Sequence, residues 1–357
     1  MSKFLFVTIA GKIGSVDVGV GHLNRSIVIA KEVIKRGHSV YFLYSGDKKA
    51  EQVLTESKLE FYQIDLDNLS NSTNKLQALN KECEICFIDL SHPFFLDNFE
   101  KINFLINMLN KNGNKLILID SSDQIILKKV KKESIDLLIV ADFAFIGLNY
   151  DFEQKLVGEE FVILSKEYRD VPKKKIVNRA RNFLVSCGGS DPDKLTLLSL
   201  AALGKIEGDL DIKIVTGPLF SKELRDSIEK VALVFPHKIE IISSPNSLLN
   251  YIVWSDIVIS ASGLTKYEIM ATGTPSVIIL YDDKQLLINQ SLINSKATHA
   301  VHRDIPENQF TNDLISLMQN RLRRKEMSKI SQSIIDTKGV DRIINFIEKE
   351  YISSSLR

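Results

Sequence analysis

The sequence predicts an α/β protein made of two doubly wound parallel sheets in tandem. Short, continuously apolar runs alternate with longer amphipathic segments, which is typical of parallel strands covered on both faces by helices. The alternation stops near residue 165 and restarts at Phe183. The length of 357 residues also suits two domains of roughly 150 residues each.

In the first half, strands are predicted at residues 5–9, 39–43, 85–89, 116–119 and 137–140. Amphipathic stretches over residues 23–36 and 98–111 predict helices between them. Gly37 follows the first of these helices, at the position where glycine commonly ends a helix.

In the second half, strands are predicted at residues 183–187, 212–215, 239–242, 257–260 and 276–280, and helices at residues 192–203, 221–231, 265–271 and 286–295. We therefore expect a first domain over 1–165, a linker over 166–181, a second domain over 182–330 and a helical segment over 331–357. That last segment contains an amphipathic stretch, 342–351, that could return to the first domain.

The expected linker is basic, since it contains Lys173, Lys174, Lys175, Arg179 and Arg181. A run of this kind is more often a solvated connection than a nucleic-acid patch. Over the whole chain, 46 Lys and Arg balance 45 Asp and Glu, which gives a net charge of +1. Binding duplex DNA needs a concentrated cationic face, so this balance argues against a nucleic-acid partner. A local site for a small anion is still allowed.

The composition excludes several classes of protein. Hydrophobic residues make up 44% and charged residues 25%, which excludes a disordered chain, a collagen and a small disulfide scaffold. No apolar run reaches the ~18 residues needed to span a bilayer, and the first ten residues predict a strand rather than a signal peptide. We expect a cytoplasmic protein without stable membrane insertion, and the sequence leaves the oligomeric state open.

Cys83 and Cys86 form a C-x-x-C pair, and His92 follows. A metal or redox site would fit this spacing. A buried strand fits it better, because Cys86 leads into an apolar run and no second pair of ligands accompanies the thiols. We expect no metal, no other cofactor, and a reducing compartment.

The turn before the first helix carries several candidate site residues. Gly19 and Gly21 allow a tight turn and close approach of a ligand, although the third glycine of the dinucleotide fingerprint is missing. His22 could accept a proton near neutral pH, or merely cap its helix. Arg25 lies one turn further on, and Asp17 could orient an imidazole or be a simple loop acid.

A second group of polar residues follows the predicted strand at 85–89. Asp89 ends that run and His92 lies three residues later. Polar residues at the carboxyl ends of parallel strands often line the ligand site of an open α/β sheet. Asp89 and His92 are therefore candidates for ligand binding, with helix capping by the aspartate as the alternative. Asp120 and Asp123 follow a later strand in the same way, with the same alternative.

One loop of the second domain is a plausible phosphate site. It contains Gly188, Gly189, Ser190 and Asp191, in which two glycines, a hydroxyl and an N-cap acid precede a predicted helix. The loop is not a P-loop, because the Gly-Lys-Ser/Thr ending is missing.

A later loop gives a stronger signal. Ser262, Gly263, Leu264 and Thr265 lie at a predicted helix start, where N–H and hydroxyl groups can bind a diphosphate. Glu268 lies one turn along, where a carboxylate can accept both hydroxyls of a ribose. Thr265 and Glu268 also have the spacing of a capping box. Both interpretations can hold together.

Five segments carry a family resemblance. They are Gly-x-Gly-His-x-x-Arg at 19–25, Gly-Glu-Glu-Phe-Val-Ile-Leu-Ser-Lys-Glu-Tyr at 158–168, Gly-Gly-Ser-Asp at 188–191, Ser-Gly-x-Thr-x-x-Glu at 262–268 with Gly-x-Pro at 273–275, and Ile-Asp-Thr-Lys-Gly-Val-Asp-Arg at 335–342. The chain resembles the nucleotide-sugar hydrolases of pseudaminic acid biosynthesis, which remove UDP from a 2,4-diacetamido-trideoxy-altrose. These proteins look like inverting GT-B glycosyltransferases, with two Rossmann domains facing across a cleft.

The resemblance implies a metal-independent reaction on a UDP-sugar. The second domain would hold UDP, the first would hold the sugar, and His22 would orient or deprotonate the attacking water, so that the sugar configuration inverts. Two places depart from the family pattern. The family usually has Asp-His-Tyr where this chain has Asp89-Leu-Ser-His92, and Asn-Gln where it has Lys284 and Gln285. Lys284 and Gln285 are thus further candidates for substrate binding.

Three functions compete on this basis. A hydrolase comes first. A glycosyltransferase that moves the sugar to an acceptor would use the same architecture, so the fold cannot separate the two. An acceptor groove or a basic and apolar membrane patch on the first domain would favour the transferase, and the sequence shows no such patch. The third function is a non-catalytic sugar-nucleotide binding protein, which an intact His22 disfavours.

Overall fold

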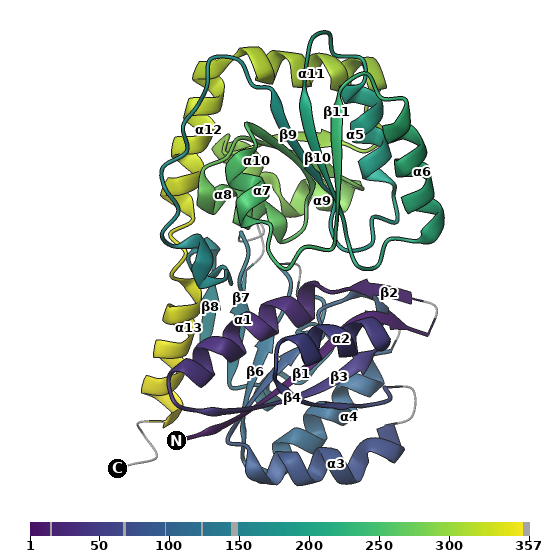
Figure 1. The fold of residues 1–357 in the computed structure, drawn as a ribbon. Helices are drawn as coiled ribbons and strands as arrows, with labels where there is room; N and C mark the ends of the chain where they lie inside the picture. The colour runs from purple at the N-terminus through teal and green to yellow at the C-terminus, as the bar shows by residue number, and fades with distance from the viewer. Residues whose placement is uncertain (15, 67–68, 97, 123, 144–148, 353–357) are drawn as a thin grey trace. The chain divides into compact units, whose positions relative to one another are not determined.

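The chain divides into two compact units. The computed structural model describes residues 1–14, 16–66, 69–96, 98–122, 124–143 and 149–352 (Figure 1). Unit 1 comprises Met1–Leu164 and Lys338–Arg357, and unit 2 comprises Ser165–Thr337. Each unit is built on one parallel sheet with helices, so the predicted class of two doubly wound α/β domains is confirmed.

Unit 1 contains an eight-stranded sheet in the order β4-β3-β1-β5-β6-β7-β8, with β2 paired to β1. β2 is antiparallel to β1, and the other described pairings are parallel. The strands are β1 (Lys3–Ile13), β2 (Val16–Gly19), β3 (Ser39–Gly46), β4 (Glu60–Gln63), β5 (Ile85–Asp89), β6 (Lys115–Ile119), β7 (Leu137–Val140) and β8 (Lys155–Val157).

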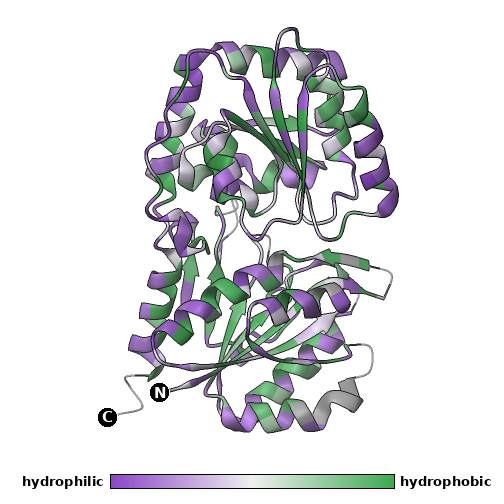
Figure 2. Cartoon of the chain, in the orientation of Figure 1, coloured by the Kyte–Doolittle hydropathy of each residue, from purple (hydrophilic) through white to green (hydrophobic). Residues whose placement is uncertain are grey.

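Helices cover both faces of this sheet, which is why its strands are continuously apolar. One core contains side chains of α1 (Gly21–Lys35), α2 (Lys48–Glu56) and α13 (Gly339–Ile347). The core on the other face contains side chains of α3 (Leu69–Glu82) and α4 (Phe99–Leu109). Figure 2 shows the apolar residues gathered along the strands. The short helical turns of unit 1 are η1 (Pro93–Leu96), η2 (Asn110–Asn112), η3 (Lys132–Ser134), η4 (Glu159–Phe161) and η6 (Glu348–Ile352).

The C-terminal segment packs within unit 1, where α13 contacts α1 and η4. Arg36, at the end of α1, forms a 2.7 Å ion pair with Glu348. Gly339, the first residue of α13, packs closely against the backbone of Val162. A Cβ at this position would lie 2.2 Å from the carbonyl oxygen of Val162. The helix that carries His22 is therefore held at its far end by the C-terminal segment.

Unit 2 contains a six-stranded sheet in the order β11-β10-β9-β12-β13-β14, and its described pairings are parallel. The strands are β9 (Asn182–Ser186), β10 (Asp211–Thr216), β11 (Lys238–Ser243), β12 (Ile257–Ala261), β13 (Ser276–Leu280) and β14 (His299–His302). The helices are η5 (Lys166–Tyr168), α5 (Leu195–Leu203), α6 (Lys222–Leu233), α7 (Leu249–Trp254), α8 (Thr265–Thr272), α9 (Asp283–Ile288), α10 (Gln290–Ser295), α11 (Glu307–Gln319) and α12 (Arg321–Ile334). In the described part of the chain, no helix has the length and apolar character needed to cross a membrane.

Three details differ from the sequence-based expectations. α5 begins at Leu195 rather than at residue 192, and the helix expected at 286–295 is two helices that meet at Asn289. The segment 166–181 belongs to unit 2, as does 331–337. Lys174 of the expected linker donates hydrogen bonds to the carbonyl oxygens of Val253 (2.7 Å) and Ser255, so this part of the segment is anchored.

The C-x-x-C pair is part of the hydrophobic core of unit 1. Cys83 and Cys86 are both buried free thiols. Burial raises the pKa of each thiol to about 12, so both are protonated at neutral pH. Cys86 lies in β5, as the strand interpretation predicted, whereas Cys83 is buried in the connection between α3 and β5.

Candidate functional site

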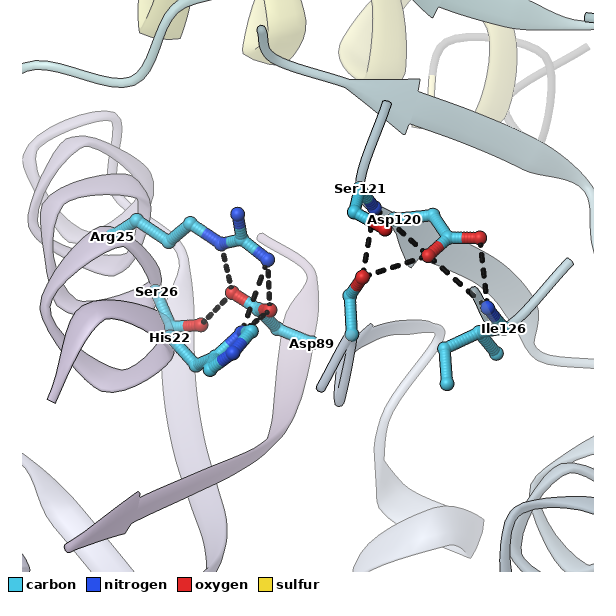
Figure 3. A network of polar contacts seen from close by, with 8 residues as sticks. His22, Arg25, Ser26, Asp89, Asp120, Ser121 and Ile126 are labelled. Carbon is cyan, nitrogen blue, oxygen red and sulfur yellow. Dashed lines mark hydrogen bonds and ion pairs between the residues drawn. The ribbon is translucent and has the colours of Figure 1, made fainter. Parts of the chain in front are cut away.

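Three candidate residues of unit 1 converge at one edge of its sheet (Figure 3). β5 ends at Asp89, while β1 leads through β2 into α1, whose first turns carry His22 and Arg25. Because β1 and β5 pair in parallel, the segments that follow them start from the same edge of the sheet. The two candidate groups, which are far apart in the sequence, therefore form one cluster.

Asp89 is the centre of this cluster. His22 Nδ1 lies 2.7 Å from Asp89 Oδ1, and Arg25 Nε donates to Asp89 Oδ2 at 2.6 Å. Arg25 Nη2 donates to Asp89 Oδ1, so the guanidinium binds the carboxylate with two N–H groups. Ser26 Oγ adds a longer hydrogen bond of 3.3 Å to Asp89 Oδ2. Two-pronged contacts of this kind fix the geometry as well as adding energy.

These contacts determine which nitrogen of His22 can accept a proton. Nδ1 lies 2.7 Å from Asp89 Oδ1, which can only accept, and 3.1 Å from Arg25 Nη2, which can only donate. We assign the proton of the neutral ring to Nδ1 on the basis of the shorter contact, so that Nδ1 donates to Asp89. Nε2 is then the basic nitrogen. The N-cap of α1 is Val20, and no side chain caps that helix end. His22 therefore does not cap the helix.

The charges of the cluster stabilise one another. Burial would favour the neutral form of Asp89, but Arg25 and then His22 outweigh it and hold the pKa of this carboxyl below its usual range. Burial likewise opposes the charge of Arg25, and the nearby Asp89 raises its pKa nevertheless. Only 1% of the Asp89 side chain is exposed, against 13% for His22 and for Arg25. Asp89 and Arg25 are therefore an ion pair at neutral pH.

His92 lies beside His22, with ring centroids 6.4 Å apart in an edge-to-face arrangement. Burial and, to a lesser extent, the charge of His22 lower the pKa of His92 to about 4. His92 Nδ1 accepts the N–H of Phe94 at 3.1 Å, so the neutral ring carries its proton on Nε2. The two imidazoles are thus complementary, because His22 can accept a proton while His92 can donate a hydrogen bond.

Asp120 lies near this cluster in Figure 3, but its contacts show a different role. Its carboxylate accepts hydrogen bonds from Ser91 Oγ and from the N–H of Leu127, each at 2.8 Å. The N–H of Ser121 donates to Ser91 Oγ at 2.8 Å. Burial raises the pKa of Asp120, and these hydrogen bonds partly oppose that shift. Asp120 therefore caps backbone groups and ties the loop after β6 to the loop that carries His92.

The remaining candidates of unit 1 lie around the turn before α1. Gly19 ends β2 with a φ of +67°, a conformation that glycine adopts without steric cost. Gly21 is the first residue of α1. Asp17 pairs with Lys12 in the β1–β2 ladder, but its side chain lies outside the described part of the structure. Asp123 also lies outside the described residues.

In unit 2, Ser262 and Gly263 connect β12 to α8. Ser262 Oγ donates to Gln285 Oε1 at 2.7 Å, which brings α9 against this turn. The N–H of Gln285 donates to Asp282 Oδ1, also at 2.7 Å, so Asp282 caps α9. Gly263 is exposed, as is Lys284. Of the two candidates on α9, Gln285 is the one in contact with the Ser262 turn.

Glu268 does not form the capping box that the spacing allowed. Thr265 is the first residue of α8 rather than its N-cap, and no side chain caps that end. Glu268 lies next to Tyr168 of η5 instead. Burial raises the pKa of Glu268 to about 7, the Tyr168 hydroxyl opposes the shift, and Glu167 adds to it. Tyr168 is a neighbour that sequence reasoning missed, although it lies in the family-like segment 158–168.

The loop at 188–191 contains the helix-capping acid that the sequence predicted, and its role as a phosphate site stays a prediction. Asp191 Oδ1 accepts the N–H of Leu195 at 2.7 Å, and its Oδ2 accepts the N–H of Thr196 at 2.9 Å. These N–H groups at the start of α5 are therefore already bound to a carboxylate of the chain. Gly188 is exposed, with a φ of +90°. The residues of this loop open to a ligand are those at its tip, Gly188 to Ser190, rather than Asp191.

Two buried polar residues near the Ser262 turn were also missed. Lys266 is 4% exposed and Asn289 is 1% exposed, and Lys266 Nζ donates to Asn289 Oδ1 at 2.8 Å. The sequence offered one indication of Lys266, because a lysine stands at the start of a predicted helix between the candidates Thr265 and Glu268. Periodicity alone does not show that such a lysine points inward.

Part of the chain matches a known family model. Residues 183–343 match the glycosyltransferase family 28 C-terminal domain, a stretch that runs from β9 into α13. The uncharacterized protein MJ1062 of Methanocaldococcus jannaschii is 25% identical over 348 residues, which cover 90% of this chain and 68% of that protein. The spore coat polysaccharide biosynthesis protein SpsG of Bacillus subtilis is 22% identical over 201 residues, which cover 54% of this chain and 58% of SpsG.

Solved structures extend the likeness to the whole chain. MurG of Acinetobacter baumannii superimposes with a TM-score of 0.67 at 15% identity, covering 97% of this chain and 99% of MurG. Anabaena HepE, solved in complex with UDP-glucose, gives a TM-score of 0.63 at 12% identity and covers 98% of this chain and all 100% of HepE. The chain has the GT-B fold. The family 28 match covers the strands of unit 2 from Phe183 on, together with the turn that contains Ser262 and the helix that contains Glu268.

Proposed function

We propose that this GT-B protein is a nucleotide-sugar hydrolase. Water would attack the anomeric carbon of a UDP-diacetamido-trideoxy-sugar with inversion and release of UDP, in the biosynthesis of a pseudaminic-type acid. The 2.7 Å contact between His22 Nδ1 and Asp89 Oδ1 carries the proposal, because it leaves Nε2 as a proton acceptor. HepE with its bound UDP-glucose supports a UDP-sugar, and the five family-like segments support this sugar class.

His22 acts as general base in this reaction. As the water oxygen bonds to the anomeric carbon, Nε2 takes a proton from the water, and the bond from that carbon to the UDP oxygen breaks. The electron pair of that bond leaves with UDP. Asp89 stays ionised beside Arg25 and stabilises the imidazolium that forms. General bases of this type contribute about 10²–10⁴-fold to a rate.

Arg25 and His92 have supporting roles in the sugar-binding unit. Arg25 donates one hydrogen bond to each oxygen of the Asp89 carboxylate, which fixes the imidazole that shares this carboxylate. His92 is neutral at physiological pH because its pKa is lowered to about 4. Its Nε2–H donates a hydrogen bond to the sugar or to the attacking water, next to the proton acceptor on His22.

Unit 2 binds the UDP. The turn from Ser262 to Thr265 and the tip of the 188–190 loop provide N–H and hydroxyl donors, which stabilise the charge that grows on the leaving diphosphate. Gln285 holds the Ser262 hydroxyl in place. Glu268 accepts hydrogen bonds from the ribose hydroxyls. The family 28 match of this region supports the assignment.

The decisive experiment is incubation with a panel of nucleotide sugars in the absence of any acceptor. We expect proton NMR to show free UDP and free sugar, and the first-formed anomer to have the opposite configuration from the substrate. The His22→Ala variant is the matched control and should release no UDP above background. Absence of turnover with every donor, in a protein that binds UDP, would reject hydrolysis.

A GT-B glycosyltransferase is the second candidate. The family 28 match and the likeness to MurG favour it, and an acceptor hydroxyl can replace water as the nucleophile that His22 deprotonates. The same assay separates the two functions. A transferase would release UDP at a substantial rate only after an acceptor is added, and a new glycosidic product would appear.

A further inference from the structure

A buried polar network connects α8 to the helices that follow β13. Lys266 Nζ donates to Asn289 Oδ1 at 2.8 Å. Asn289 Nδ2 donates to the carbonyl oxygen of Gln285 at 2.8 Å and to its Oε1 at 3.2 Å. The same Oε1 accepts the hydroxyl of Ser262 at 2.7 Å. Three hydrogen bonds therefore link the Lys266 ammonium to the turn assigned to the diphosphate.

The orientation of every group in this network is determined by its neighbours. An ammonium can only donate, so Asn289 presents its oxygen to Lys266 and its Nδ2 to Gln285. Gln285 must then present Oε1 to Asn289, and its Nε2 donates to the hydroxyl of Tyr281 at 2.7 Å. Asn289 stands at the junction of α9 and α10.

Lys266 is a buried ammonium that has lost its hydration. The hydrogen bond to Asn289 and the ring of Tyr267, whose centroid lies 4.8 Å from Nζ, offset part of that loss. Lys266 is the second residue of α8, so its charge adds to the partial positive charge of the helix start. A cation that directly follows a turn with exposed Gly263 and Leu264 raises the local potential that an anion would meet there.

We propose that Lys266 is the cationic positioning residue of the diphosphate subsite. It supplies a buried positive charge directly after the Ser262–Thr265 turn and, through Asn289 and Gln285, orients the Ser262 hydroxyl. This inference deepens the proposed function, since it rests on the assignment of the nucleotide diphosphate to unit 2. The charge acts on the diphosphate and not on the nucleoside, and this distinction makes the inference testable.

The test compares UDP with uridine in two variants that remove the charge differently. Lys266→Met keeps the side-chain length, and Lys266→Gln keeps a hydrogen-bond donor. We expect UDP affinity to fall by about tenfold or more in both, the loss typical of a charged hydrogen-bonding partner, while uridine affinity changes less than about twofold. Calorimetry measures UDP binding, and NMR titration measures the weaker uridine binding.

A third variant and a control address the stability of the fold. Asn289→Asp keeps the lysine but pairs its ammonium with a carboxylate, so UDP affinity should fall while uridine affinity is retained. Lys174→Met is the matched control, because Lys174 is another sequestered lysine of unit 2 that donates to backbone carbonyls away from the turn. This control should bind UDP like the unmodified protein.

The outcomes separate the inference from the proposed function. Unchanged UDP affinity in folded Lys266→Gln would overturn the role of the charge while leaving UDP binding to unit 2 intact. Equal losses for UDP and uridine would also overturn it, since they would indicate general damage to the site. Failure of the unmodified protein to bind UDP at all would instead reject the proposed function, and the inference with it.

Discussion

The candidate sites of the two units differ in how charge is placed. In unit 1, a fully buried Asp89 binds both His22 and Arg25, so the same charges that would carry the chemistry also stabilise the fold. In unit 2, the candidate site is a turn at the start of a helix. Its Ser262 hydroxyl is connected by hydrogen bonds between amide side chains to one buried lysine, Lys266. The difference implies that substitutions in unit 1 change turnover and stability, whereas substitutions in unit 2 change nucleotide affinity.

The largest effect that would test this division is expected for His22→Ala. Loss of the general base should reduce turnover by about 10²–10⁴-fold and leave UDP affinity within about twofold. A turnover assay by NMR and calorimetry with UDP measure the two quantities. His299→Ala is the control, because that histidine lies in unit 2 and pairs with Asp313. Unchanged turnover in His22→Ala would remove His22 from the mechanism.

Asp89→Asn tests whether the same cluster also supports the fold. The substitution leaves the Arg25 guanidinium buried without its carboxylate, which typically costs about 3–5 kcal/mol of unfolding free energy. Urea denaturation measures this loss. Asp313→Asn provides the comparison. Asp313 pairs with His299 at a partly exposed position, so this substitution should cost about 0–1 kcal/mol of unfolding free energy. A loss below about 1 kcal/mol in Asp89→Asn would show that the Asp89 cluster contributes little to the stability of unit 1.

The acid sensitivity of unit 1 follows from the same carboxyl. The pKa of Asp89 is lowered in the folded protein, so its stabilising contribution is present above the unfolded value of about 3.9 and is lost as pH falls through the folded value. We expect the unmodified protein to lose unfolding free energy on acidification below about pH 4 more steeply than Asp89→Asn. Parallel pH profiles for the two proteins would contradict this role for Asp89.

The sequence predicted the central strands of both sheets because they are buried on both faces and therefore continuously apolar. It did not predict β4 and β14, since Glu60–Gln63 and His299–His302 are short edge strands with a mixed pattern. It placed His22 and Asp89 at strand ends, but not in contact. Their contact depends on the parallel pairing of β1 with β5, which no local pattern specifies.

Two residues of unit 2 show what the sequence could and could not predict. It predicted Asp191 as a helix-capping acid, and the Asp191 carboxylate accepts the N–H groups of Leu195 and Thr196. It did not predict that Lys266 is buried, because a lysine at a helix start usually faces solvent. The burial of Lys266 depends on tertiary packing.

Gly339→Ala sharpens the comparison by disturbing unit 1 away from the cluster of His22, Arg25 and Asp89. The new Cβ would meet the carbonyl oxygen of Val162 at 2.2 Å, so α13 must shift away from η4, at a cost of about 1–3 kcal/mol. Hydrogen exchange in α1 should increase, with UDP affinity unchanged. Asp341→Ala on the same helix removes a partly exposed 3.6 Å ion pair with Arg36 and should cost less than about 1 kcal/mol. Equal stability of both variants would show that α13 adapts to the extra atom.

The smallest effect is expected in unit 2, for Glu268→Gln. The glutamine keeps an acceptor for the ribose hydroxyls but loses the charge, so UDP binding should weaken by about 1 kcal/mol. Because burial raises the pKa of Glu268 to about 7, its ionised fraction grows between pH 6 and pH 8, and UDP affinity should rise over that range. The terminal phosphate of UDP also titrates in this range and changes the affinity of both proteins. The pH dependence of UDP affinity is therefore compared with that of Glu268→Gln, which should be flatter than that of the unmodified protein.

Glu229→Gln on the exposed face of α6 should behave like the unmodified protein. Identical affinities and pH profiles for Glu268→Gln and the unmodified protein would limit Glu268 to packing against Tyr168, leaving the turn and its buried lysine as the nucleotide determinants of unit 2.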